Sequence, residues 1–351
     1  GNGAQVIVTG CYAETNPDDI KKLGGGTKIV GNSEKQLITA YAGVAESISP
    51  SQMLPVVKGT RTRSVIKIQD GCESYCSYCI IPHARGKSRS IPPEEVIERF
   101  KALVEIDSPE IVLSGIHIGK YGKDINSTLS LSALVSELIC LRGSTRIRLS
   151  SIEPREVTPE IINMLGKGLC RHLHIPLQSG DDEILKAMNR DYSVHFYREI
   201  IRDVAAQVND VAIGADVIVG FPGESIEHFQ NTVELIEDIP LTHLHVFSYS
   251  PRPGTIAFNM KNHVSDKNKK LRNEELRSIG LKKNYEFRKR CLGKILQVII
   301  EPLQRGAEMY SGMSDNYVRV SVQGVKEYHI GNKIDVSIVK VSEQATIGRA
   351  L

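Results

Sequence analysis

Three cysteines stand close together with a spacing that suits an iron–sulfur cluster. Cys72, Cys76 and Cys79 form a C-x3-C-x2-C run directly after a predicted strand. Three thiolates on one tight loop can hold three irons of a [4Fe–4S] cube. The fourth iron then stays open to an outside molecule, so the spacing predicts chemistry at the cluster and not only electron storage.

A structural zinc site is the alternative interpretation of the same loop. His83 follows the triplet and would complete a Cys3His ligand set. Zinc knuckles usually form small folds of their own, whereas this loop opens a long pattern of alternating strands and helices. The context therefore favours the iron–sulfur cluster.

The composition predicts two or three domains in a reducing compartment. A chain of 351 residues exceeds the usual size of one hydrophobic core. Of its 7 cysteines, three crowd into one loop, which suits a metal better than disulfides. No apolar run approaches the roughly 20 residues that a membrane span needs. We therefore expect a cytoplasmic protein without membrane contact.

Six predicted strands alternate with amphipathic helices in the middle of the chain. The strands are expected at residues 64–69, 110–116, 146–152, 172–178, 211–219 and 243–249. Helices at 94–106, 131–140 and 225–238 lie between them, as repeated βαβ crossovers require. Six units instead of eight predict an α/β fold in the form of an open, partial (β/α)6 TIM-like barrel. In such barrels the active site lies at the carboxyl ends of the strands.

The flanking segments predict three further units. Residues 5–10 and 17–23 have the pattern of a strand and a helix, and we expect the start of this α/β domain to be missing. Residues 46–62 are rich in Ser, Pro and Gly, as linkers are. A basic helical stretch at 266–291 precedes short strands at 295–301, 317–322 and 333–341, which predict a small all-β barrel. The expected domains are 1–45, the linker 46–62, 63–291 and 292–351.

These segments together resemble the radical S-adenosylmethionine (radical SAM) enzymes, and more narrowly their methylthiotransferase branch. Residues 8–14 resemble the end of that branch's N-terminal domain, 71–86 its cluster loop, and 220–224 and 249–255 its fifth and sixth strands. The C-terminal barrel resembles a TRAM domain, an OB-like RNA-binding module. Residues 114–122 and 148–154 are most similar to the bacterial enzymes that methylthiolate N6-threonylcarbamoyladenosine (t6A) beside the tRNA anticodon. Sister enzymes that act on isopentenyladenosine in tRNA or on a ribosomal-protein aspartate stay open as alternatives.

The resemblance implies two clusters and one small-molecule cofactor. Cys72, Cys76 and Cys79 would hold a [4Fe–4S] cluster whose open iron binds S-adenosylmethionine (SAM). An external electron donor would drive cleavage of SAM to a radical that takes hydrogen from adenine C2. A second [4Fe–4S] cluster would supply sulfur from three N-terminal cysteines, of which this chain has Cys11 alone. A simple core thiol is the alternative for Cys11.

The expected contacts to SAM follow the cluster loop and the strand ends. They are Tyr78, Ser114, Gly115, Ser150, Glu153, Gln178, Ser179, Gly220 and Gly223. An ordinary place on the barrel rim is the alternative for each of them.

Charge indicates RNA as the partner. The helix at 267–290 carries ten Lys and Arg against three Glu, a composition that suits a surface in contact with the phosphates of a nucleic acid. A helix face that is only solvated could have the same composition. The resemblance implies that this partner is the tRNA anticodon loop, and we expect a monomeric protein.

Two rival functions use other features of the chain. One is a hydrolase metal site on the pairs His172 and His174, and His243 and His245. No bridging carboxylate is evident near these pairs, so we expect the histidines to point outward under helices or to hydrogen-bond at the rim. The other is a non-catalytic RNA-binding protein with structural zinc, which would be colourless, whereas the enzyme would be brown.

Overall fold

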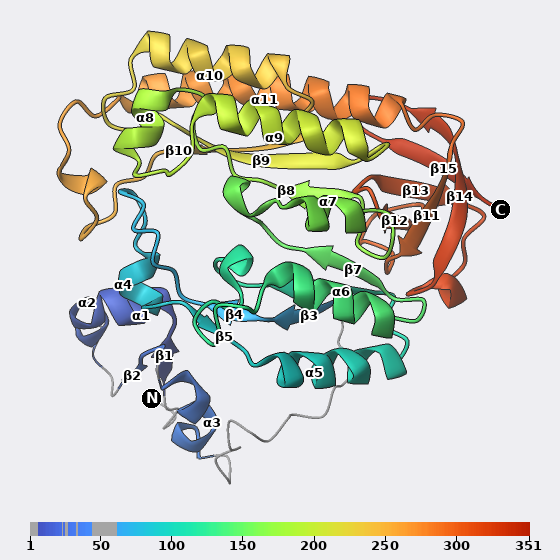
Figure 1. Cartoon of the computed structure of the whole chain (residues 1–351), viewed down its shortest axis with the longest axis horizontal. Coiled ribbons are helices and arrows are strands. Elements are labelled where there is room, and N and C mark those ends of the chain that lie inside the picture. The colour runs from blue at the N-terminus through green and yellow to red at the C-terminus, as the bar shows by residue number, and fades with distance from the viewer. Residues whose placement is uncertain (1–5, 23, 25–26, 33, 44–61) are drawn as a thin grey trace.

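The structure is a computed structural model, and it describes residues 6–22, 24, 27–32, 34–43 and 62–351. A curved sheet with helices on its outer side fills the centre, a small β-barrel closes one end, and the N-terminal segment lies near the other (Figure 1). The six parallel strands of the centre are β3 (Ser64–Lys67), β6 (Glu110–Ser114), β7 (Arg146–Leu149), β8 (His172–His174), β9 (Ala212–Val219) and β10 (His243–Ser248).

The strand order makes this sheet an open barrel. Three strands pair in the order β3-β6-β7 and three in the order β10-β9-β8. A bridge between Ser151 and His174 joins the two halves beyond the end of β7. In the described part of the chain, β3 and β10 pair on one side only, so the barrel does not close. This confirms the predicted (β/α)6 TIM-like fold, with most strands shorter than predicted where the chain turns into the site loops.

Alternating apolar residues explain why helices cover the outer face. Ile111 and Leu113 of β6 point to the same side and are fully buried beneath the helices. Val96 and Phe100, four residues apart, lie on the buried face of α5. The covering helices are α5 (Pro93–Glu105), α6 (Leu131–Leu141), α7 (Pro159–Met164), α8 (Asp182–Ala187), α9 (Val194–Gln207), α10 (Ile226–Asp238) and α11 (Asp266–Lys289).

The C-terminal segment forms the predicted β-barrel, with two strands that the sequence did not reveal. The closed barrel contains β11 (Ile295–Ile300), β12 (Ser311–Ser314), β13 (Arg319–Gln323), β14 (Lys333–Val341) and β15 (Thr346–Ala350). The prediction omitted β12 and β15. A small closed barrel is consistent with a TRAM domain, and the domain bounds given above stay a prediction.

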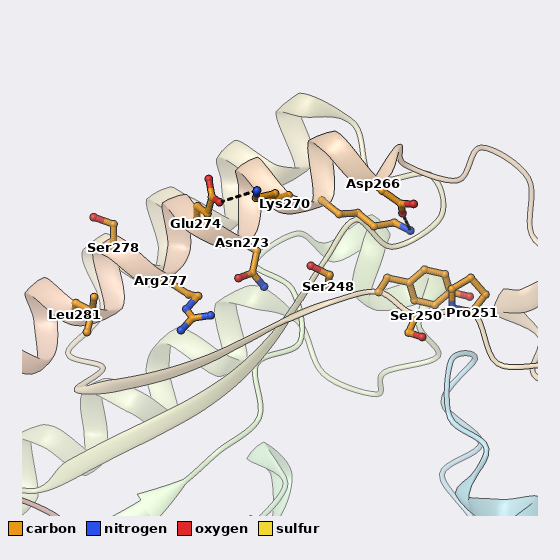
Figure 2. A pocket seen from close by; sticks show the side chains of 12 residues that line it. Ser248, Ser250, Pro251, Asp266, Lys270, Asn273, Glu274, Arg277, Ser278 and Leu281 are labelled. Atoms are coloured by element: carbon orange, nitrogen blue, oxygen red, sulfur yellow. Dashed lines mark hydrogen bonds and ion pairs between the residues drawn. The ribbon is translucent and has the colours of Figure 1, made fainter. Parts of the chain in front are cut away.

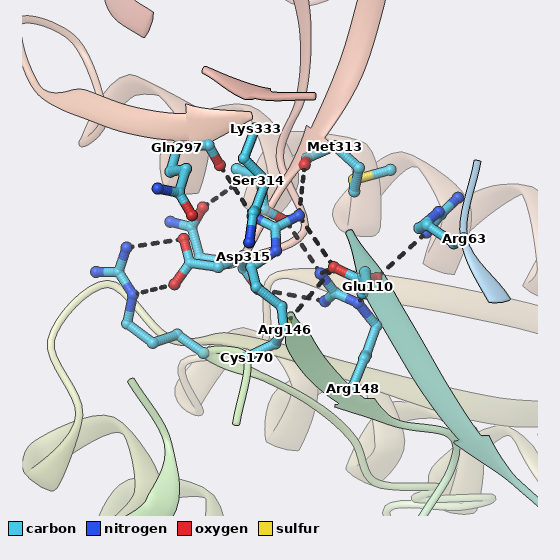
Figure 3. Close-up of polar contacts among 12 residues, drawn as sticks. Arg63, Glu110, Arg146, Arg148, Cys170, Gln297, Met313, Ser314, Asp315 and Lys333 are labelled. Atoms are coloured by element: carbon cyan, nitrogen blue, oxygen red, sulfur yellow. Dashed lines mark hydrogen bonds and ion pairs between the residues drawn. The ribbon is translucent and has the colours of Figure 1, made fainter. Parts of the chain in front are cut away.

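A buried ion network joins this barrel to the amino ends of the central strands (Figure 3). Arg148 donates to Glu110 at 2.7 and 2.9 Å and to the backbone oxygen of Ser314 at 3.1 Å. Arg146 lies 3.0 Å from Glu110 and donates to the Met313 backbone oxygen at 3.0 Å. The C-terminal barrel therefore blocks the amino end of the central barrel and leaves the carboxyl end open.

The N-terminal segment lies beside the loop that carries the cysteine triplet. Strand β1 (Ile7–Thr9) pairs in parallel with β2 (Lys28–Val30), and helices α1 (Cys11–Thr15), α2 (Pro17–Lys21) and α3 (Ile38–Tyr41) surround them. Helix α1 packs against α4 (Ile81–Arg85). The predicted linker at 46–62 lies, apart from Thr62, outside the described residues. Among the helices described, none combines the length and apolarity that crossing a bilayer demands.

Candidate functional site

The cysteine loop is closed on itself by backbone bonds. It follows β4 (Gln69–Asp70), which pairs antiparallel with β5 (Arg89–Ser90), and Cys72 N donates to Gly86 O at 3.1 Å. Gly71 has φ +76°, and a Cβ there would lie 2.0 Å from Lys87 O, so only glycine fits. These contacts fix the loop at the carboxyl end of the first barrel strand, where a barrel enzyme has its site.

A buried glutamine that sequence reasoning missed joins this loop to the end of β6. Gln69 Nε2 donates to Gly71 O at 2.8 Å, and its Oε1 accepts from the backbone N–H groups of Ile116 at 3.1 Å and His117 at 2.8 Å. Gly115 packs against the same residue, because a Cβ there would lie 2.8 Å from Gln69 O. The predicted SAM contact Gly115 therefore also has a packing reason to be glycine.

The three thiols differ in their surroundings. Burial of Cys72 would raise its pKa, but hydrogen bonds with His117, at 3.5 Å, and Ser74 outweigh burial and lower the pKa to about 7. Burial raises the pKa of Cys79 to about 11. The Arg190 guanidinium donates to Cys76 Sγ at 3.3 Å. Positive neighbours favour the thiolate that metal binding requires.

The arrangement of the three sulfurs fits a cluster better than one zinc ion. A tetrahedral zinc ion with bonds of about 2.3 Å needs its sulfurs within about 4 Å of one another. Among the described residues, no ligand group within 4.8 Å contains these cysteines. His83, the fourth ligand of the zinc alternative, is exposed on α4. A [4Fe–4S] cube binds each cysteine through a separate iron, so it does not require the three sulfurs to lie within 4 Å of one another.

Buried polar atoms without partners surround the same end of the barrel. In the described part of the chain, Ser150 Oγ, Gln178 Oε1 and Tyr249 OH are buried and accept or donate no hydrogen bond. An unpaired buried polar group costs about 1–3 kcal/mol. Gln178 also has φ 65°, a strained backbone for a non-glycine residue. These atoms fit a polar ligand such as SAM, and Tyr249 was not among the predicted contacts.

Two more predicted residues lie beside the cysteines. Glu153 forms an ion pair with Arg190, the same side chain that contacts Cys76. Tyr78 packs with Phe221 and Tyr249 in a small apolar cluster. Burial raises the pKa of Tyr78 well above its ordinary value. A cavity of about 180 Å³ opens here, lined by residues that include Cys76, His117 and Glu153.

The remaining predicted contacts lie at turns, and some are occupied by the protein itself. Ser114 ends β6. The hydroxyl of Ser179 lies 3.4 Å from Thr232 Oγ1 on α10, on the helix side of the barrel. Gly220 has φ +74° and faces Lys269 of α11, whereas a Cβ added at Gly223, which has φ +86°, would meet no described atom within 4 Å. The structure thus brings Tyr78, Ser150, Glu153 and Gln178 to the open end, and it encloses Ser179 and Gly220.

Cys11 lies close to the cysteine loop. Burial would lower the pKa of Arg85, but hydrogen bonding to Cys11 and the charge of Asp70 raise it. Arg85 ends α4, the helix that follows the triplet. The segment carrying Cys11 therefore stands at the mouth of the barrel, where a second cluster would have to lie.

The histidine pairs lie inside the barrel, which corrects the prediction that they point outward or sit at the rim. His172 and His174 alternate with Leu173 along β8, and His243 and His245 alternate with Leu244 along β10. Leu173 and Leu244 belong to the apolar core under the helices, so the four histidines face the inside of the barrel. Asp216 lies 2.8 Å from His174 and 3.2 Å from His245, so a carboxylate does join the two pairs. The sequence did not show this, because Asp216 comes from a third strand.

A second cavity lies on the outer side of β10. It has a volume of about 820 Å³ and lies between α11 and the end of β10 (Figure 2). Asn273 and Arg277 reach from the helix toward the strand. This cavity is separate from the one beside Cys76.

Comparisons with known proteins agree with this site. Residues 66–236 match the model of the radical SAM superfamily. The chain is 37% identical to the threonylcarbamoyladenosine tRNA methylthiotransferase MtaB of Bacillus subtilis (strain 168), over 95% of this chain and 78% of that protein. It is 38% identical to the tRNA-2-methylthio-N(6)-dimethylallyladenosine synthase of Thermoanaerobacter sp. (strain X514), over 72% of this chain and 54% of that protein.

A solved structure supports the fold. The cobalamin-dependent SAM radical enzyme OxsB, with aqua-cobalamin and SAM bound, superposes with a TM-score of 0.51 over 80% of this chain and 44% of that one, at 12% identity. The cysteine loop lies at the open end of a six-stranded barrel, and the sequence matches MtaB over most of its length. Both observations assign the chain to the same family. The chain belongs to the radical SAM superfamily and, within it, to the family of the threonylcarbamoyladenosine tRNA methylthiotransferases.

Proposed function

We propose that this protein replaces the hydrogen on C2 of t6A in the tRNA anticodon loop with a methylthio group. The observation that carries the proposal is the cysteine triplet at the open end of the barrel, with unpaired polar atoms buried beside it. The cofactors are a [4Fe–4S] cluster and SAM, as in the radical SAM superfamily. When bound, they supply a one-electron cleavage that yields a carbon radical able to take the C2 hydrogen.

The chain's own residues bind and orient these groups. Cys72, Cys76 and Cys79 hold the cluster, and the Arg190 guanidinium places a positive charge beside Cys76. The expected SAM contacts are Tyr78, Ser114, Gly115, Ser150, Glu153, Gln178, Ser179, Gly220 and Gly223. Ser150 and Gln178 have the strongest support, because each offers a buried oxygen without a partner.

Cys11 is one ligand of the sulfur-supplying cluster. We further propose that the protein acts in the cytoplasm as a monomer with an external electron donor.

Mass spectrometry of tRNA nucleosides tests this function. The reconstituted protein, SAM and a reductant are incubated with tRNA that carries t6A, and the expected product is its 2-methylthio form. Cys79→Ala abolishes 5′-deoxyadenosine formation, whereas Cys11→Ala spares it and stops sulfur insertion. Cys140→Ala, an exposed thiol on α6, is the matched control.

Other products would redirect the assignment. A methylthio group on dimethylallyladenosine alone would identify the sister activity. Unchanged tRNA would contradict a tRNA substrate and favour the ribosomal-protein aspartate. A 5′-deoxyadenosine signal from Cys79→Ala would contradict the role of the triplet.

A further inference from the structure

Three polar side chains meet inside the barrel below the cysteine loop. His174 ends β8, and Asp216 and His245 lie on the next two strands, β9 and β10. Asp216 Oδ1 lies 2.8 Å from His174 Nε2 and 3.2 Å from His245 Nδ1. The two imidazole rings are stacked with centroids 5.0 Å apart. One carboxylate oxygen therefore positions both rings.

The backbone of β9 makes room for this arrangement. Gly214 pairs with His174, and a Cβ at position 214 would lie 2.6 Å from His174 Nδ1. Only glycine lets the imidazole lie this close to the strand. Ile213 and Ala215, on either side of Gly214, are fully buried on the opposite face. The strand thus separates an apolar face under the helices from a polar face inside the barrel.

The exposure of the cluster argues against a purely structural role. The side chain of His174 is 12% exposed, that of Asp216 24% and that of His245 56%. His172, one level deeper, is buried and stacks on Tyr317 of the C-terminal barrel at 4.2 Å. Packing against that barrel covers the His172 ring, whose buried Nδ1 has no hydrogen-bond partner among the described residues. The upper cluster, in contrast, is open to a ligand.

The position of the cluster is inside the barrel and below its rim. His245 stands three residues before the end of β10, which corresponds to about 10 Å at the usual rise of a strand. The predicted SAM contacts Ser150 and Gln178 follow the ends of their strands. Gln178 N donates to Asp216 O at 2.8 Å, and Ser151, next to Ser150, pairs with His174. The cluster therefore lies directly beside those contacts and extends the same polar surface into the barrel.

We propose that His174, Asp216 and His245 bind the threonylcarbamoyl substituent on N6 of the target adenosine. This inference rests on the proposed function. The substituent carries a carboxylate, a hydroxyl and carbamoyl N–H groups, and the cluster offers both donors and acceptors. Asp216 occupies one nitrogen of each ring. The free nitrogen of His174, Nδ1, lies against Gly214, so the ring nitrogen open to the substituent is Nε2 of His245, whose side chain is 56% exposed.

The same cluster would exclude the other adenosine that relatives of this chain recognise. A dimethylallyl group has no polar atom, so burying it here would remove water from the outer ring nitrogen of His245 and from the Asp216 carboxylate without giving either a new partner. Sites built to hydrogen-bond a substrate reject analogues that lack the polar group much more strongly than apolar pockets reject a size change. The cluster is therefore the specificity determinant for an N6 substituent that can form hydrogen bonds.

Binding of two anticodon stem-loops tests the inference. The loops have one sequence and differ only in t6A or unmodified adenosine, and their Kd values are measured with the anaerobically reconstituted protein. The wild type binds the t6A loop more tightly. In His245→Leu that preference falls about tenfold or more, as expected when a hydrogen bond to a charged group is lost. His245→Gln, which keeps a polar end, restores part of it, and His195→Leu on the exposed face of α9 keeps the wild-type preference.

Three results would overturn the inference. The first is that His245→Leu and His174→Leu retain the wild-type preference for t6A. The second is a divalent ion, besides cluster iron, that is bound at one per chain in the wild type and lost in His245→Leu, because the cluster would then be a metal site. The third is a wild type that forms no methylthiolated t6A, which would remove the proposed function itself and is recognised separately by nucleoside mass spectrometry.

Discussion

Gln69 shows how one residue can hold the cluster loop in place. Its side chain is fully buried, and its amide bonds to backbone groups of the cysteine loop and of the loop after β6. We expect Gln69→Leu to leave several of these groups unpaired and to lower the free energy of unfolding by about 3 kcal/mol or more. The same variant should bind less iron per chain after reconstitution, because Cys72 follows the loosened turn.

The control for Gln69 is Gln207→Leu, at an exposed position near the end of α9. Iron content is measured by colorimetric assay and unfolding by urea titration followed by circular dichroism. Wild-type iron content and stability in Gln69→Leu would show that the amide does not support the loop.

At the scale of residues, the sequence predicted what depends on local spacing. The cysteine triplet was found because its three ligands lie within one loop. Gln69, Arg190 and Asp216 were missed because each acts through contacts with distant segments, such as Arg190 with Cys76, 114 residues earlier. No local pattern distinguishes such a residue from an ordinary polar one, since only the fold supplies its partner.

At the scale of elements, the contacts of α11 correct the prediction that its basic residues form one RNA-binding surface. Four of its ten basic side chains serve the fold and do not face solvent as free charges. Arg272 pairs with Glu224, Lys283 donates to the backbone oxygen of Ile239 at 2.8 Å, and Arg288 donates to that of Ser342 at 2.8 Å. Lys269 is buried against Gly220. The helix therefore packs on β9 and β10 and stabilises them, and only its other basic side chains are available to bind RNA.

Arg277 is the charge on α11 best placed to bind a tRNA phosphate. It lines the 820 Å³ cavity beside β10, and the described residues include no carboxylate partner for it (Figure 2). We expect Arg277→Ala to weaken tRNA binding and to reduce the slope of log K against log salt by about one. Filter binding at several salt concentrations measures both quantities.

The matched control is Lys289→Ala, in the last turn of the same helix and outside the cavity. Lys289 lies 3.6 Å from Glu286, so it is already partly neutralised. If wild type and Arg277→Ala had equal slopes of log K against log salt, Arg277 would not contact a tRNA phosphate.

Strand β12 illustrates why some elements escaped prediction. Its sequence, Ser311-Gly312-Met313-Ser314, has neither alternation nor β-branched residues. Gly312 is required by tertiary structure, because a Cβ there would lie 2.1 Å from Ile299 O on the neighbouring strand. Closure of the barrel and not local preference makes this segment a strand. A central strand such as β6, in contrast, has buried apolar residues at alternate positions, Ile111 and Leu113, and this local pattern can be recognised from the sequence.

At the scale of the whole molecule, the two barrels share one set of buried charges. Arg171 of the central barrel donates to Asp315 of the C-terminal barrel at 2.7 and 3.0 Å, and Arg63 lies 3.2 Å from Glu301. Arg63 therefore serves the contact between the barrels at the closed end. The network keeps the predicted RNA-binding barrel at a fixed place relative to the cysteine loop.

Glu110 is the central acceptor of this network, and its removal tests how firmly the barrels are joined. Burial opposes its ionisation, but Arg148, Arg146 and Arg63 lower its pKa below the ordinary value. Glu110→Gln keeps the volume and removes the charge, so the buried guanidinium groups lose their counterion. Breaking a buried ion pair in this way costs about 3–5 kcal/mol. We expect a loss of this size in the free energy of unfolding, together with faster proteolysis of the C-terminal barrel, because that barrel is held through the same arginines. Glu308→Gln, an exposed glutamate in the turn before β12, should change neither quantity. Wild-type stability and protease resistance in Glu110→Gln would mean that apolar contacts alone hold the barrels together.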